Sequence, residues 1–158
     1  MKDGKIIAEN YELMEVVPKI YPKDKKLQAI IDKESLPYRD EIDKVLDYTK
    51  TPLYRYFIVE NPMDNFIADA ARWKTGVDIS LSNGFQFSPP LNTPPEGVSP
   101  ITQSFIWNML PVNEYVKTGK ATGQQIQDWL ETELHNVFAK NATERFGGWM
   151  VRYSGMTV

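Results

Sequence analysis

The chain contains few side chains that can act as nucleophiles, bases or metal ligands. Its 158 residues include no cysteine and a single histidine, His135. Disulfides, thiolate metal sites and cysteine nucleophiles are therefore excluded, and a serine–histidine–aspartate site would have to use that one histidine. A metal site would have to consist mainly of carboxylates. The sequence predicts no catalytic residue and no metal site in this chain.

Two titratable residues are candidates for chemistry, and a structural role is favoured for both. Counting 100° per residue from Ile126 places His135 on the polar face of its helix, so a solvated histidine is favoured over a ligand or a proton shuttle. The run Glu-Leu-His at residues 133–135 lacks the second histidine, one turn away, that a zinc motif needs. Asp69 lies at the edge of an apolar helix face, where pairing with Arg72 or accepting a backbone hydrogen bond is favoured over catalysis.

The best candidate for ligand binding is the run Leu-Ser-Asn-Gly-Phe-Gln-Phe at residues 81–87. Asn83 and Gly84 both tolerate positive φ, so spacing alone favours a simple turn. The functional alternative is that Asn83 presents its amide at the carboxyl end of a strand, where ligands gather in sheet proteins. The aromatic rings on either side of Gln86 would then line a cleft, although rings in such loops more often cap a core. The candidate substrate-binding residues are Asn83, Gly84, Phe85, Gln86 and Phe87.

Charge and hydropathy limit the partners. Eighteen Lys and Arg against 21 Asp and Glu give a net charge of -3, which indicates no basic surface for a phosphate backbone, so nucleic acid is not an expected partner. No apolar run approaches the roughly 20 residues that cross a bilayer, and the first ten residues lack the apolar core of a signal peptide. A membrane is not an expected partner, and any export signal would lie outside this sequence.

In the first third of the chain, the pattern predicts a helix and then strands. Residues 1–23 suit an extended segment or edge strand. Residues 24–35 have the apolar period of an amphipathic helix, with a possible continuation past Pro37 to about residue 43. Residues 44–59 are rich in β-branched and aromatic residues, which predicts one or two strands broken near Pro52.

Residues 61–76 have clear helix start and stop signals. Asn61 suits the N-cap, Pro62 the first helical position and Gly76 the left-handed residue after the end. We expect the helix to pack by one aromatic side while Arg72 faces away. This side consists of Phe66, Ile67, Ala70 and Trp73. Residues 77–81 alternate in the way of a half-buried strand, with Val77, Ile79 and Leu81 inward.

The remaining segments alternate between loops, helices and strands. Five of the eleven prolines lie in residues 84–100, which predicts a stiff loop. Helices are expected at residues 101–110 and 123–140, and strands at residues 113–119 and 149–155. Because many connections are too short for parallel crossovers, the fold class predicted is α+β, with helices packed on a mixed sheet.

These motifs, taken in this order, resemble the C-terminal domain of the metallophosphoesterase-type 5'-nucleotidase family. The family's GNLxADAM helix is similar to residues 64–71, and its strand ending in NGG is similar to residues 81–84. Its ITxxDlxxvLP motif resembles residues 101–111, and its vxlTGxxLxxxLE motif resembles residues 116–131. The similarity covers about residues 24–156, so residues 24–158 are interpreted as the domain and residues 1–23 as a linker from a preceding N-terminal domain.

The resemblance implies a division of labour between two domains. In the family, this α+β domain closes over a small-molecule substrate, a nucleotide or other anionic ester, while two divalent metal ions and the catalytic groups belong to an N-terminal metallophosphatase domain. The chain would then be the substrate-recognition part of a hydrolase that is secreted or periplasmic, with that N-terminal domain as its partner and no cofactor of its own. Hydrolysis in such enzymes uses a metal-activated water.

The sequence departs from nucleotidases at three points. Nucleotidases continue NGG as NGGGIR, with an arginine on the anionic substrate, whereas Gln86 follows Phe85 here and the run contains no arginine. Val112 replaces the aromatic residue of the family's LPF. The second aromatic that stacks on the base belongs, in the family, to a segment that would lie beyond Val158, so the resemblance implies a domain truncated at its C-terminal end. A nucleobase sandwich, worth ~1–3 kcal/mol per stacked ring, is not apparent.

Two runs are more similar to another branch of the superfamily, the dimanganese thiosulfohydrolases of sulfur oxidation. Residues 81–87 resemble that branch's LSPGFRW. Residues 147–155, near the end of the chain, resemble its GGDMVRVGG. The branch's arginine after Gly-Phe is Gln86 here, and its proline is Asn83. The alternatives to a nucleotidase are therefore the same domain of a thiosulfohydrolase-like enzyme, or a ligand-binding module without catalysis.

Overall fold

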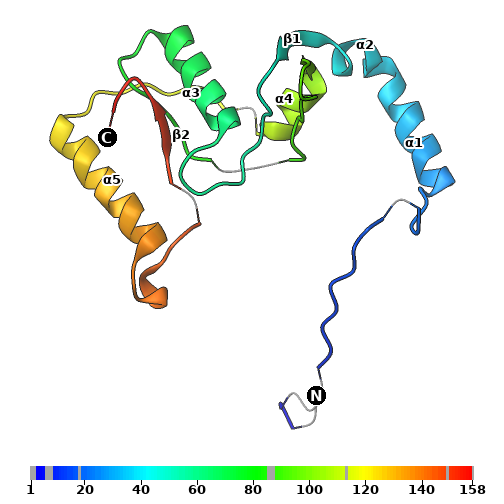
Figure 1. Cartoon of the computed structure of the whole chain (residues 1–158), viewed down its shortest axis with the longest axis horizontal. Helices are drawn as coiled ribbons and strands as arrows, with labels where there is room; N and C mark the ends of the chain where they lie inside the picture. Colours follow the sequence, from blue (N-terminus) through cyan, green and yellow to red (C-terminus); the bar gives the residue numbers. More distant parts are fainter. Residues whose placement is uncertain are drawn as a thin grey trace. The chain divides into compact units, whose positions relative to one another are not determined.

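A computed structural model describes residues 3–5, 9–17, 19–84, 88–112, 114–148 and 150–157. Its internal contacts divide the chain into two units, Met1–Arg39 and Asp40–Val158 (Figure 1). No helix among the described residues is long and apolar enough to cross a membrane.

The first unit contains the expected amphipathic helix. Helix α1 spans Lys25–Ser35 and begins where the Asp24 carboxylate accepts hydrogen bonds from the backbone N–H groups of Lys26 and Leu27, at 2.8 and 3.0 Å. The short 3₁₀ helix η1, Leu36–Tyr38, follows at Pro37. Helix α2, Arg39–Ile42, starts at the last residue of this unit and continues to the predicted end of the helical region. Residues 9–17 form neither helix nor strand and are exposed except at Val17, as expected for an extended segment.

In the second unit, an antiparallel pair of strands leads into a helix. Strand β1, Val45–Thr49, pairs with β3, Ser99–Thr102, and α4, Gln103–Met109, starts directly after β3. The hydroxyl of Thr102 caps this helix by accepting from the N–H of Phe105 at 3.1 Å. A small apolar core lies beside them and consists of Leu53, Met63, Ile101 and Met109.

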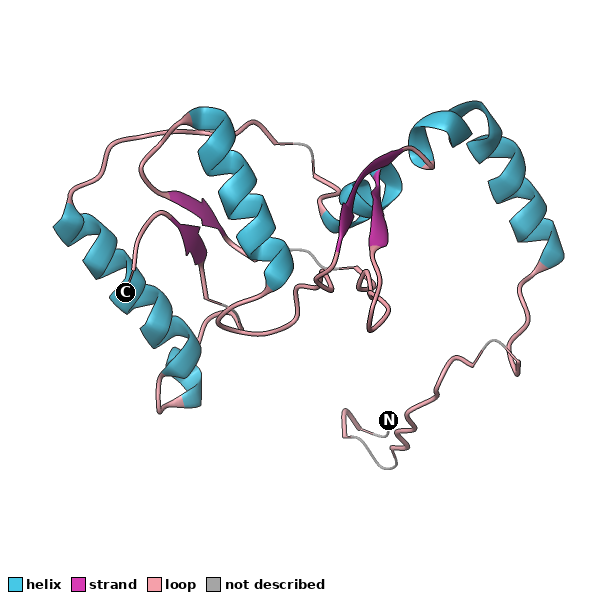
Figure 2. Ribbon diagram, turned by 45° about the horizontal axis from the view of Figure 1, so that its top comes forward, coloured by secondary structure: helices cyan, strands magenta, loops and turns pink. Residues whose placement is uncertain are grey.

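A second antiparallel pair lies against the capped helix of the sequence prediction. Helix α3, Pro62–Thr75, packs on β2, Ser80–Ser82, and on β4, Arg152–Ser154, which pair with each other (Figure 2). Helix α5, Gly123–Phe138, begins with a complete capping box between Thr122 and Gln125, and η2, Ala142–Glu144, precedes β4. The α+β class is confirmed, but the described strands form two small antiparallel sheets instead of one mixed sheet.

Two predicted strands are absent from the described residues. Leu53 makes only an isolated bridge to Leu91, so no second strand follows Pro52. Residues 114–119 are irregular and exposed, although their composition predicted a strand. In both segments β-propensity does not suffice, because strand formation depends on a neighbouring strand with which to pair. The predicted helix at residues 101–110 begins only at Gln103, since Ile101 and Thr102 belong to β3.

The buried side of α3 differs from the prediction. Trp73 is 83% and Phe66 43% exposed, whereas Met63, Asp64 and Ala68 are buried. The helix therefore does not pack by its aromatic side, because the residues of its first turns contact a polar cluster and the small core instead. The buried side of β2 also differs from the prediction, since Ser80 and Ser82 are buried while Leu81 is 47% exposed.

Gly76 permits the predicted end of α3. It has φ of 70°, its N–H donates to the carbonyl of Arg72 at 2.9 Å, and a Cβ added there would meet nothing within 4 Å. Gly76→Ala should therefore destabilise the unit only through the left-handed backbone, by about 1–2 kcal/mol in urea unfolding. Gly123→Ala is the control, since Gly123 begins α5 in open space and alanine favours helix. Equal losses in the two variants would contradict this explanation.

Candidate functional site

The candidate site follows directly from the end of β2. Asn83 is exposed and Gly84 is buried, and Gly84 has φ of 67°, the left-handed conformation predicted for a turn. Phe85, Gln86 and Phe87 lie outside the described residues, so the arrangement of their rings, over a core or along a cleft, stays a prediction. The structure therefore places the first two candidate residues at the end of a strand whose last residue, Ser82, is buried.

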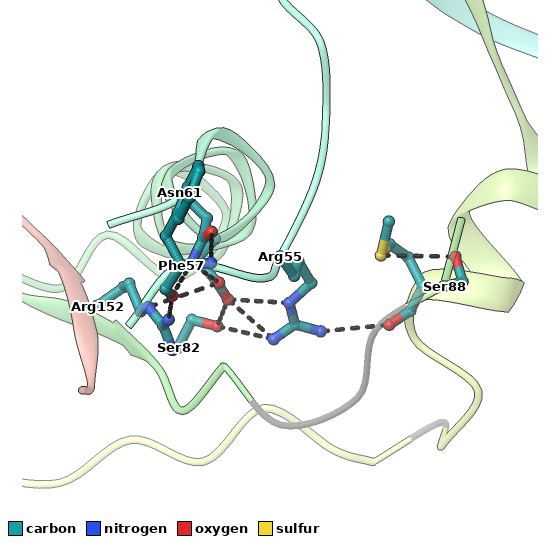
Figure 3. Close-up of polar contacts among 8 residues, drawn as sticks. Arg55, Phe57, Asn61, Ser82, Ser88 and Arg152 are labelled. Atoms are coloured by element: carbon teal, nitrogen blue, oxygen red, sulfur yellow. Dashed lines mark hydrogen bonds and ion pairs between the residues drawn. The ribbon is translucent and has the colours of Figure 1, made fainter. Parts of the chain in front are cut away.

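A buried carboxylate lies beside that strand end. Asp64, in the first turn of α3, has no exposed surface, and its Oδ1 accepts the Ser82 hydroxyl at 2.6 Å and two N–H groups of Arg55 at 2.8 and 3.1 Å (Figure 3). Its Oδ2 accepts from the Asn61 amide at 3.4 Å. The carboxylate thus joins the helix, the strand end and the segment that precedes the helix.

Arg55 extends this arrangement to α4. Its Nη1 donates to the carbonyl oxygen of Met109 at 3.2 Å, while its Nη2 lies 3.4 Å from the hydroxyl oxygen of Ser82. Met109 in turn accepts from the hydroxyl of Ser88 at its sulfur, with 3.7 Å between the two atoms (Figure 3). The Arg55 side chain is 2% exposed, so these bonds replace the hydration of its guanidinium.

Arg152 of β4 is the last member of the cluster, and fewer of its nitrogen atoms are hydrogen-bonded than those of Arg55. Its Nη2 donates to the carbonyl of Phe57, and its Nε lies 3.7 Å from Oδ2 of Asp64. Nε and Nη1 are buried and have no hydrogen-bond acceptor within the described part of the chain. Burial lowers the pKa of Arg152 from its ordinary value; the charge of Asp64 opposes this shift and the charge of Arg55 adds to it. An arginine still retains its proton at neutral pH.

We define the Asp64 cluster as Arg55, Asn61, Asp64, Ser82 and Arg152. Two guanidinium groups and one carboxylate give it one net positive charge within buried surroundings. No group of three or more His, Cys, Asp and Glu that could hold a metal occurs among the described residues. The cluster can therefore orient the segments that meet in it, and its residues do not form such a metal-binding group.

The sequence interpretation missed this cluster. Asn61 occupies the N-cap position, but its side chain makes no cap bond; it bonds the N–H and C=O of Phe57 at 2.7 and 2.8 Å. No role was assigned to Asp64 beyond its place in the run of residues 64–71 that resembles the family's helix. The available signal was the placement of Arg55 and Arg152 inside runs of apolar and aromatic residues, where a buried cation needs a carboxylate partner.

The other titratable candidates are exposed. The imidazole of His135 is 61% exposed, with Nε2 3.5 Å from a carboxylate oxygen of Glu144, which agrees with the interpretation of a solvated histidine. Asp69 is exposed on α3. The Arg72 side chain donates to the backbone carbonyl of Asp78 at 3.0 Å, so it supports the turn between α3 and β2.

A pocket of about 220 Å³ lies on the other face of β2 and is lined by Leu81, Ala121, Gln125, Ile126 and Trp129. The Leu81 side chain is directed to α5 in this pocket, which explains why the alternating pattern placed Leu81 among the inward residues. The pocket is separate from the Asp64 cluster, because Leu81 and Ser82 point to opposite faces of the strand.

A known protein family matches most of this sequence. The sequence model of the family described as 5'-nucleotidase, C-terminal domain, matches residues 43–158, which include both antiparallel pairs and the Asp64 cluster. No curated protein matches the chain. Since the match covers most of the sequence and nearly all of the second unit, the chain belongs to the family of 5'-nucleotidase C-terminal domains.

Proposed function

We propose that this chain is the substrate-recognition domain of a 5'-nucleotidase-family hydrolase. The family match over residues 43–158 carries the proposal. The substrate is a small molecule, either a nucleotide or another anionic ester, and Asn83, Gly84, Phe85, Gln86 and Phe87 face it. Residues 1–23 act as the linker and residues 24–158 as the domain.

The chemical step belongs to another domain in this proposal. The described residues do not fit a metal centre, so the two divalent ions are assigned to an N-terminal metallophosphatase domain of the same polypeptide. The part played by this chain is to bind and orient the substrate beside that domain. Such enzymes are secreted or periplasmic, which is the location proposed here.

Asn83→Ala is the direct test of this role. In the polypeptide that carries both domains, assayed with added Mn²⁺, we expect kcat/KM to fall at least about tenfold, as for loss of one hydrogen bond to a charged group. Asn92→Ala is the matched control, since Asn92 is an exposed asparagine of the loop that follows. If both variants retain the parent activity, Asn83 does not contact the substrate.

A thiosulfohydrolase-like activity is the second candidate. It is favoured by the runs Gly84-Phe85 and Met150-Val151-Arg152, which match that branch, whereas Gln86 stands in place of the branch's arginine. Parallel assays of phosphate esters and of thiosulfonates distinguish the two activities. Absence of turnover with both substrates in the metal-loaded two-domain polypeptide would favour a ligand-binding module without catalysis.

A further inference from the structure

Three aromatic rings contact one another in the segment that precedes α3. The rings of Tyr54 and Tyr56 are stacked, with centroids 5.3 Å apart and an angle of 9° between their planes. The ring of Phe57 meets both of them edge to face, at 5.5 and 6.3 Å. Tyr56 is 53% and Phe57 60% exposed, whereas Tyr54 is half-buried, so Tyr56 forms the outer end of the stack. We call these three rings the aromatic platform.

The backbone of this segment is held at several points, although it forms neither a helix nor a regular strand. Leu53 exchanges two backbone hydrogen bonds of 3.0 Å with Leu91. The Asn61 amide bonds both the N–H and the C=O of Phe57, and the same carbonyl accepts from Arg152 of β4 (Figure 3). Two members of the Asp64 cluster therefore fix the backbone from which an exposed ring of the platform projects.

A fixed group of exposed rings is suited to binding another ring. Little conformational freedom is lost on binding when the contacting side chains are already ordered, and aromatic side chains supply a large contact area. The flat face of a tyrosine stacks on any planar ring, independently of the hydrogen-bonding groups that this ring carries. A ring added to Tyr56 would repeat the arrangement that Tyr54 and Tyr56 already have.

The charges next to the platform select the charge of the ligand. Residues 51–61, all of which the structure describes, contain two charged side chains, Arg55 and Glu60. Arg55 is buried and paired with Asp64, whereas Glu60 is exposed and its carboxylate accepts from the Asn65 amide at 2.8 Å. The negative face of an aromatic ring attracts a cation, and the exposed carboxylate adds to this attraction. The surroundings therefore favour a positively charged ligand.

We propose that the aromatic platform binds a small organic cation with a planar aromatic ring, which stacks on Tyr56. Phe57 contacts the same ligand, and Tyr54 supports the stack from behind. Asn61 is a positioning residue, since it fixes the backbone of Phe57 without touching the ligand. This inference does not rest on the proposed function, whose substrate is anionic and faces residues 83–87.

Titration of the full chain with 2-naphthylmethylammonium, followed by the amide NMR signals of residues 54–58, tests the proposal. A ligand of roughly 12 non-hydrogen atoms is expected to bind with a Kd on the order of 2 mM. The anion 2-naphthoate has the same ring system and should bind at least about threefold more weakly. The proposal fails if the signals of residues 54–58 show no saturable change, or if the two probes bind equally well.

Substitutions at Tyr56 separate stacking from general apolar contact. Tyr56→Ala and Tyr56→Leu both remove the ring and should raise Kd for the cation at least about fivefold, whereas Tyr56→Phe keeps the ring and the parent Kd. Tyr115→Ala is the control, since Tyr115 is 91% exposed and lies outside the platform, and it should leave Kd unchanged. Parent affinity in Tyr56→Leu, or an equal loss in Tyr115→Ala, would overturn the proposal.

Two other occupants of the platform give different results. If a second copy of the chain covers it, sedimentation shows a concentration-dependent dimer that Tyr56→Ala abolishes. If another domain of the same polypeptide covers it, this chain binds the naphthyl cation but the two-domain polypeptide does not. Either result would overturn the proposal, whereas binding by both proteins, with a monomeric chain, supports it.

Discussion

Asp64→Asn is expected to destabilise the second unit by about 3–5 kcal/mol, the usual cost of removing one partner of a buried ion pair. The amide keeps the shape of the carboxylate but removes the only negative charge of the Asp64 cluster. Arg55 and Arg152 would then share a buried region as two positive charges, each with a side chain 2% exposed. Urea unfolding followed by tryptophan fluorescence would show the lower midpoint.

Asp69→Asn is the control for this charge. Asp69 lies on the same helix, five residues further along, and is exposed, so its substitution should change the free energy of unfolding by no more than about 0.5 kcal/mol. The prediction fails if the two variants unfold at the same urea concentration. A loss in Asp64→Asn of less than 1 kcal/mol would mean that water or protein motion compensates the two guanidinium groups.

Met63→Ala is expected to cost about 2–5 kcal/mol, the range for truncating a buried Leu, Ile or Met side chain to alanine. Met63 has no exposed surface and packs with Leu53, Ile101 and Met109. Because this core consists of few side chains, the cavity left by the thioether has few neighbours that can fill it. Urea unfolding of the full chain measures the loss, with an m-value close to that of the parent chain.

Met14→Ala is the matched control for the core substitution. Met14 belongs to the first unit and is 62% exposed, so its truncation creates no buried cavity. We expect its midpoint to equal that of the parent chain. A Met63→Ala variant that unfolds together with Met14→Ala would show that the core around Met63 can collapse on the vacated volume.

Features that depend on residues close together in the sequence were predicted better than features that depend on distant residues. The limits of α3 and α5 depend on residues next to the helix in sequence, such as Pro62, Gly76 and the capping box of Thr122 and Gln125. Caps of this kind act within about one turn, so the sequence pattern locates them well. Strands were harder to predict, because β1 and β3 are separated by some fifty residues and pairing needs the partner in place.

The predicted packing faces failed where a polar group is buried. Periodicity placed Phe66 and Trp73 on the buried side of α3 and Ser80 on the exposed side of β2. In the structure, Phe66 and Trp73 are exposed and Ser80 is buried. A hydrophobic pattern assumes that buried residues are apolar, whereas here hydrogen bonds to Asp64 allow Ser82 and Arg55 to be buried. No local rule brings Arg152 to Asp64, which lies far away in the sequence.

The sequence by itself determined the α+β class, the family, the principal helices and the position of Asn83 and Gly84 after a strand. It could do so because helix signals and family motifs are local runs of residues. Only the tertiary structure decided which side of α3 is buried and that Arg55, Asp64, Ser82 and Arg152 meet at the end of β2. Burial of these charges depends on partners from distant segments, so it is defined only once the chain has folded.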